Sequence, residues 1–265
     1  MTRYVPPVRR RERGKGHVYE DGNGQRIPGV TTILGDGLPK PALINWAAAA
    51  TAEAAINRWD ELAAMPPAER LKTLERARYE TTDKAKKRGT EVHAYAERLV
   101  AGEKVTGIPT ELRGHIEAYV RFLDRFDVEP VLVEAVVVNY THGYAGTLDL
   151  IAHIGETTWL LDVKTGEKGI WPETALQLAA YRFAEFYVGP DGEEHPMIPV
   201  DACGAIHTTS DDAVLIPTAS ELPQFNLFRI AAKVRDFTNN GRDLIGPPVE
   251  PDTHPSTAKV IWEET

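Results

Sequence analysis

The pattern of apolar and polar positions divides the chain into a helical first part and a mixed second part. Apolar residues recur at helical spacing over 40–65, twice within 66–102, and again over about 109–126. The second helix of 66–102 is expected from about Thr82 to Val100, with Gly102 ending it. Residues 17–35 read as a hairpin-like segment with its turn at Asp21–Gly24, and the charged residues 1–16 as a disordered basic arm.

Strand patterns dominate after residue 129. Val, Ile, Leu and Thr are enriched over 130–140, 144–154 and 157–165, and turn residues separate these runs, so a three-stranded meander is expected. A helix over 171–189, strands near 200–209 and 212–218, and a last helix from Ser220 to about Asn240 follow. The fold class is α/β (α+β, with a mixed sheet). The domain division is a basic arm (1–16), a helical N-terminal portion (17–128), a mixed core (129–246) and an irregular tail (247–265).

Composition narrows the functional classes. Hydrophobic residues make up 42% and charged residues 26% of the chain, the apolar runs are short, and the basic N-terminus has no signal-like apolar segment. A cytosolic protein without a membrane span is therefore expected. The single Cys203 excludes an internal disulfide framework and a four-cysteine iron–sulfur cluster.

The net charge of −9 argues against bulk electrostatic coating of nucleic acid. Local basic clusters remain, either as solvated faces or as nucleic-acid contacts: Arg9, Arg10, Arg11, Arg13 and Lys15, then Lys84, Lys86, Lys87 and Arg88.

Two carboxylates fall opposite one another in the expected meander. If the strands pair through a turn at Gly155, opposed residues have numbers that add to 311, as those of Asp149 and Asp162 do. Two such acids on an apolar sheet repel each other unless a cation relieves them. Lys164 as a structural ion-pair partner and a divalent metal ion are both open at this point.

The motifs around these acids resemble a known family. "GTLDLI" carries Asp149, "LLDVKTG" carries Asp162 and Lys164, and "QLAAYRFA" carries Gln177 and Tyr181. "RGTEVHAY" adds His93 upstream, and "VLVEAVVV" adds Glu134. In this order the set resembles the PD-(D/E)XK nuclease superfamily, in particular its RecB-like, phage-type exonuclease branch, without the four cysteines of CRISPR-associated relatives. The resemblance implies a restriction-endonuclease-like core over 129–246.

The resemblance also implies roles for these residues. Mg²⁺ or Mn²⁺, as one or two ions, would be held by His93, Asp149, Asp162 and the Val163 carbonyl. Lys164 would position the attacking water or stabilise the charge on the phosphate oxygens, and Glu134 would be an accessory catalytic acid. Contacts to DNA would come from Gln177, Tyr181, Arg182, Lys86, Lys87 and Arg88, with Tyr181 stacking on a base.

The implied activity is a metal-dependent exonuclease on linear DNA in phage-type recombination or repair. Its partners would be linear duplex or single-stranded DNA and a phage annealing protein or recombinase, in the host cytoplasm. A structure-specific or restriction-type endonuclease, and a DNA-binding module without hydrolysis, are the alternatives.

Overall fold

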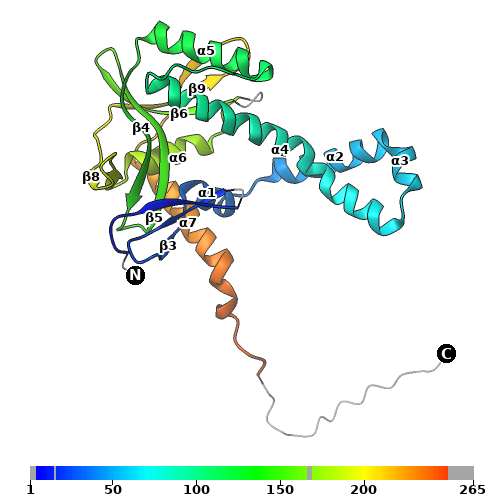
Figure 1. Ribbon diagram of the computed structural model, residues 1–265. Helices are drawn as coiled ribbons and strands as arrows, with labels where there is room; N and C mark the ends of the chain where they lie inside the picture. Colours follow the sequence, from blue (N-terminus) through cyan, green and yellow to red (C-terminus); the bar gives the residue numbers. More distant parts are fainter. Residues whose placement is uncertain (1–3, 15, 166–168, 250–265) are drawn as a thin grey trace, which may run out of the picture.

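The computed structural model of the protein describes residues 4–14, 16–165 and 169–249, and the side chains of 81–86 lie outside that description. A seven-stranded mixed sheet in the order β10-β9-β6-β5-β4-β7-β8 forms the centre, with helices on both faces (Figure 1). The strands of this sheet are β4 (Glu129–Asn139), β5 (Tyr144–Ile154), β6 (Thr157–Lys164), β7 (Phe186–Val188), β8 (Glu194–Pro196), β9 (Ala202–Thr208) and β10 (Ala213–Pro217).

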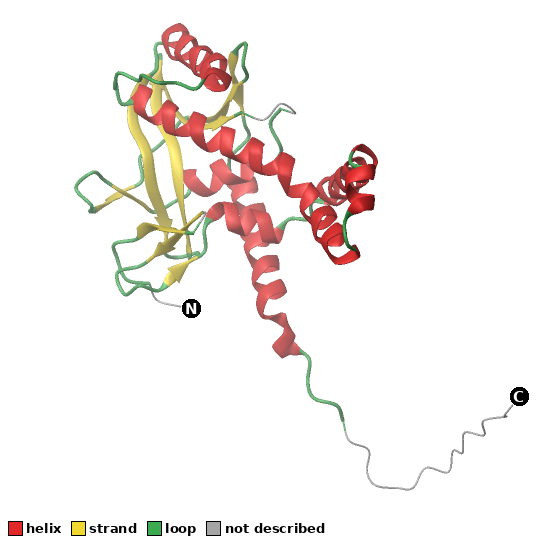
Figure 2. Ribbon diagram, turned by 45° about the vertical axis from the view of Figure 1, so that its right-hand side comes forward, coloured by secondary structure: helices red, strands yellow, loops and turns green. Residues whose placement is uncertain are grey.

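The helices are α1 (Val30–Gly37), α2 (Pro41–Asn57), α3 (Trp59–Ala64), α4 (Pro67–Val100), α5 (Thr110–Phe126), α6 (Glu173–Arg182) and α7 (Leu222–Asn240), followed by the 3₁₀ turn η1 (Gly241–Leu244). Figure 2 shows in red how these helices cover the yellow sheet and how α2, α3 and the start of α4 extend away from it. The fold class expected from the sequence, a mixed α/β core behind a helical portion, is confirmed.

The meander is also confirmed, together with its register. β4, β5 and β6 pair antiparallel in sequence order, and Leu150 lies opposite Leu161, as the turn at Gly155 predicts. Gly155 has a φ of 59°, a conformation that glycine adopts at little cost. β9 then joins β6 in parallel, which makes β6 an interior strand.

The N-terminal segment differs from the prediction, because most of the expected arm is folded. β1 (Arg9–Arg13) pairs with β2 (Gly16–Glu20), which pairs with β3 (Arg26–Ile27). Apolar contacts outweigh the charge of this segment, since Val8 and Tyr19 are buried against Val138 of the main sheet. The β2–β3 turn forms where predicted, with the Asp21 carboxylate accepting backbone N–H groups of residues 23 and 25.

Several element boundaries were wrong at sequence level. Residues 30–37 form a helix, although 30–35 were expected to belong to the hairpin-like segment. Residues 66–102 carry one helix of 34 residues instead of two, since no proline interrupts it. α6 ends at Arg182, because the following residues pair as β7 with β4. α7 begins after Glu221, whose capping box with Gln224 replaces the expected Ser220 cap.

Two hydrophobic clusters lie on opposite faces of the sheet. One joins β4, β5 and β6 to α1, α6 and α7, and includes Leu148, Leu160 and Phe228. The other joins the same strands to α4 and α5, and includes Leu150, Leu161 and Phe122. The candidate active site lies where the strands pass between these two clusters.

Candidate active site

In β4 and β5, the buried side chains change from one face of the sheet to the other at the row that carries Glu134 and Asp149. Val133 and Leu150 pack in the α4/α5 cluster, whereas Ala135 and Leu148, two residues away on each strand, pack in the α1/α6/α7 cluster. Residues i and i+2 of a regular strand share a face, so both strands turn over between these rows. The residue at the turning point of β4 is Glu134, with a left-handed φ of 46°. Such a conformation costs roughly 1–3 kcal/mol in a non-glycine residue and concentrates at functional sites.

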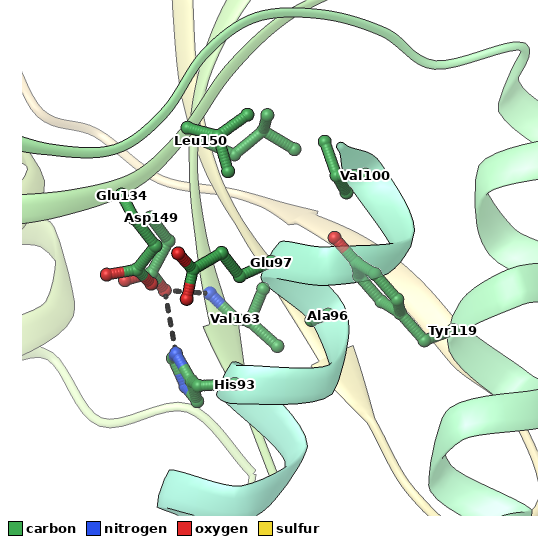
Figure 3. Close-up of a pocket in the computed structure, with 10 residues that line it drawn as sticks. His93, Ala96, Glu97, Val100, Tyr119, Glu134, Asp149, Leu150 and Val163 are labelled. Carbon is green, nitrogen blue, oxygen red and sulfur yellow. Dashed lines mark hydrogen bonds and ion pairs between the residues drawn. The ribbon is translucent and has the colours of Figure 1, made fainter. Parts of the chain in front are cut away.

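His93, Glu134 and Asp149 meet at this point. One possible ligand atom from each lies within 4.8 Å of the other two, which is close enough for one metal ion. The Nδ1 atom of His93 is 3.4 Å from Oδ2 of Asp149, and the Val163 N–H donates to the same oxygen at 2.7 Å. Figure 3 shows these side chains with Glu97 around a small pocket between α4 and the sheet.

The carboxylates of Glu134 and Asp149 have too little positive charge near them to offset burial and mutual repulsion. Burial, the charge of Asp149 and the charge of Glu97 raise the pKa of Glu134 from 4.5 to about 8. Burial and the charge of Asp162 raise the pKa of Asp149 to about 6, although His93 and Lys164 oppose the change. A divalent cation among these oxygens would remove the repulsion, and carboxylate oxygens with one imidazole suit such an ion. The donor set therefore fits a divalent metal ion, but it contains Glu134 in place of Asp162, which the motif resemblance gave as a ligand.

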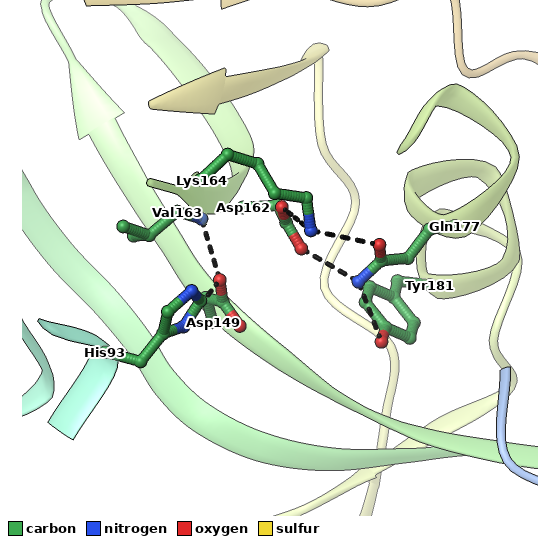
Figure 4. A network of polar contacts seen from close by, with 7 residues as sticks. All are labelled: His93, Asp149, Asp162, Val163, Lys164, Gln177 and Tyr181. Atoms are coloured by element: carbon green, nitrogen blue, oxygen red, sulfur yellow. Dashed lines mark hydrogen bonds and ion pairs between the residues drawn. The ribbon is translucent and has the colours of Figure 1, made fainter. Parts of the chain in front are cut away.

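Asp162 belongs to a second, adjacent network. Its side chain is 2% exposed and lies 2.5 Å from the Lys164 ammonium. Gln177 on α6 connects the pair, because its Nε2 donates to Asp162 Oδ1 at 2.8 Å and its Oε1 accepts from Lys164 at 3.2 Å (Figure 4). Burial alone would lower the pKa of Lys164, but the Asp162 and Asp149 carboxylates outweigh it and raise the pKa. The ammonium thus stays charged beside His93, Glu134 and Asp149, which together form the metal-type group.

Tyr181 has a packing role rather than the predicted stacking on a base. The residue is 2% exposed, and its hydroxyl lies 3.3 Å from Gln177 Nε2. A methyl group on Gly146 would overlap the Tyr181 ring, so the glycine of "GTLD" is needed for α6 to approach β5. A ring enclosed in this way cannot stack on DNA, and that prediction was wrong.

The structure separates the predicted residues into those at the site and those elsewhere. Asp162 lies outside the three-residue metal group, and Val163 contacts that group through its N–H, while a role for its carbonyl stays a prediction. The Arg182 guanidinium lies 2.6 Å from Glu221 and donates to the Val200 carbonyl at 3.1 Å, and its predicted contact with DNA stays a prediction.

The basic run on α4 stays untested as a DNA surface. Lys87 is exposed and lies 3.8 Å from Glu91, Arg88 is partly buried, and the Lys86 side chain lies outside the described residues. Sequence reasoning also missed Glu97, which lines the pocket one helical turn after His93. The spacing of the two residues in "HAYAE" was the available signal.

Comparison with protein-family models and with curated proteins finds no match to this chain. Among the residues that the structure describes, no helix combines the length and apolar character needed to cross a membrane.

Proposed function

We propose that the protein is a divalent-metal-dependent nuclease that hydrolyses phosphodiester bonds of DNA. The observation that carries the proposal is the convergence of His93, Glu134 and Asp149 beside the Asp162–Lys164 pair. Acids that repel one another on an apolar sheet are costly, so their collection from two strands and a helix needs a chemical reason. A metal-assisted reaction at a phosphate supplies that reason, and the motif resemblance supports the same class.

The two networks would have different roles, one in metal binding and the other in contacting the phosphate. His93, Glu134 and Asp149 would hold the ion, which, when bound, would polarise the scissile phosphate and lower the pKa of the attacking water. The Val163 N–H holds the Asp149 carboxylate in place through its 2.7 Å hydrogen bond. This bond orients one ligand before any ion arrives.

Lys164 would act on the substrate directly. Its side chain is 31% exposed, and Asp162 and Gln177 fix the position of its ammonium. A fixed positive charge there stabilises the negative charge that builds on the phosphate oxygens, and it orients a water by donating a hydrogen bond. Asp162 is a positioning residue in this scheme, since its carboxylate is buried and occupied by Lys164 and Gln177.

We propose an exonuclease on linear DNA as the form of this activity, on the basis of the motif resemblance. An endonuclease and a binding module without hydrolysis are separated from it by one experiment. End-labelled linear duplex, linear single strands and covalently closed circular DNA are incubated with Mg²⁺, Mn²⁺ or EDTA. Cleavage of the linear forms alone, and only with metal, is expected. Cleavage of closed circles would instead establish an endonuclease.

Variants then test the residues. Asp149→Asn and Lys164→Ala are expected to lower the cleavage rate by about 10²–10³-fold, the usual cost of removing one group that stabilises a charged transition state. Glu129→Gln, an exposed acid on the same strand as Glu134, serves as the control and is expected to keep full activity. Wild-type protein that binds DNA but does not cleave it with either metal would overturn the proposed function.

A further inference from the structure

One arginine of the N-terminal strand lies on the side of the hairpin that faces the main sheet. Arg10 is directly opposite Tyr19 in the β1–β2 ladder, and opposed residues of an antiparallel pair project from the same face. Tyr19 defines that face, since it is 5% exposed and its hydroxyl lies 2.8 Å from Oγ1 of Thr147. Thr147 shares β5 with Asp149, two residues further on. The dark blue N-terminal strands of Figure 1 accordingly lie beside the strand that carries the site.

The other arginines of β1 project from the opposite face. Arg9, Arg11 and Arg13 alternate with Arg10 along the strand. Arg11 confirms their direction, because it forms an ion pair with Glu20 at 3.0 Å, and Glu20 is opposite Arg9 in the ladder. The arginines of β1 are therefore divided between its two faces, and Arg10 lies on the face toward the main sheet; Lys15 lies outside the described residues.

The Arg10 side chain keeps capacity to bind a ligand. Its ion pair with Glu12 is 3.4 Å long, and the side chain is 38% exposed. A guanidinium has five N–H donors, so one such pair leaves donors for a ligand.

A DNA backbone bound at this site needs a second positively charged side chain besides Lys164. Lys164 lies against Asp162 and Gln177, and the open side of the metal-type group carries Glu97 and Glu134. A phosphodiester entering next to these carboxylates meets repulsion there, and the planar guanidinium fork matches phosphate oxygens in two-point contacts. We propose that Arg10 contacts a backbone phosphate of the DNA strand being cleaved and holds that strand against the acidic group. This inference rests on the proposed nuclease function.

The test compares Arg10→Ala with Arg9→Ala, which removes the same charge from the opposite face of the same strand. Cleavage of linear DNA is measured over a range of DNA and salt concentrations. Arg10→Ala is expected to raise KM about tenfold and to lower the slope of log affinity against log salt by about 0.9, the value for one lost phosphate contact. Arg9→Ala is expected to match the wild type, and Arg10→Lys to recover part of the loss.

The results separate a failure of the Arg10 inference from a failure of the proposed nuclease function. Equal KM and equal salt slope for Arg10→Ala and Arg9→Ala would overturn the inference while the nuclease function stands. A metal-induced rise in melting temperature that equals the wild type's is expected for Arg10→Ala, and its loss would show that Arg10 supports the metal group rather than the DNA. Absence of cleavage by the wild type would instead remove the proposed function itself.

Discussion

Glu134→Gln should make the metal-free protein more stable at pH 8 and remove most of its response to metal. The pKa of Glu134 is raised from 4.5 to about 8, so the folded state binds this proton more tightly than the unfolded state does. A raised pKa contributes its full stability below about pH 4.5 and loses it as pH rises through about 8. At about 1.4 kcal/mol per pKa unit, the loss has an upper limit of about 5 kcal/mol.

Partial solvent contact at Glu134 reduces that limit, and we expect about 2 kcal/mol. For a chain of this length the gain corresponds to about 4–8 °C in melting temperature. The neutral amide has no charge to repel Asp149, so the variant in EDTA should melt above the wild type at pH 8 and close to it at pH 5.

The assay is thermal unfolding of wild type, Glu134→Gln and Glu129→Gln at both pH values, in EDTA and with Mg²⁺ or Mn²⁺. Metal should raise the wild-type melting temperature more at pH 8 than at pH 5, because binding must displace the proton. Glu129→Gln, an exposed change on the same strand, should follow the wild type throughout. The reasoning is refuted if Glu134→Gln gains no stability at pH 8 in EDTA, or if its metal-induced shift equals that of the wild type.

Two further predictions concern packing and charge. Gly146→Ala should lower the free energy of unfolding by about 2 kcal/mol, because the added methyl group overlaps Tyr181, whereas Gly89→Ala inside α4 has room and should add about 0.5 kcal/mol; urea unfolding compares the two. Lys164→Met should cost about 3 kcal/mol by leaving the buried Asp162 carboxylate without its cation. Adding Asp162→Asn should restore most of that stability without restoring DNA cleavage, and recovery of activity in the double variant would argue against a role for Lys164 in the reaction.

Local patterns were enough to predict the meander and the register of β5 against β6 from the Leu150–Leu161 pair to the turn. The alternation of apolar residues marks the strands, and the short turn at Gly155 leaves one way to pair β5 with β6. The same pairing predicts that Asp149 and Asp162 lie near each other, and the charge of Asp162 does act on Asp149. The helices of the first part were also predictable, although their ends were not, because propensity within a few residues decides helix formation and distant contacts decide where a helix stops.

Only the tertiary structure decided which way each side chain faces. Glu134 and Asp149 turn toward His93 because their strands change faces between two hydrophobic clusters built from distant helices. Arg182 lies against Glu221 because α6 packs beside the start of α7, 39 residues further along the chain. Arg10 lies on the sheet-facing side of the hairpin because β1 folds back on β2, where the burial of Val8 and Tyr19 outweighs the charge of the segment. Hydrophobic burial depends on contacts between residues far apart in the chain. A motif can therefore predict which chemical groups are present, but tertiary packing determines which of them come into contact.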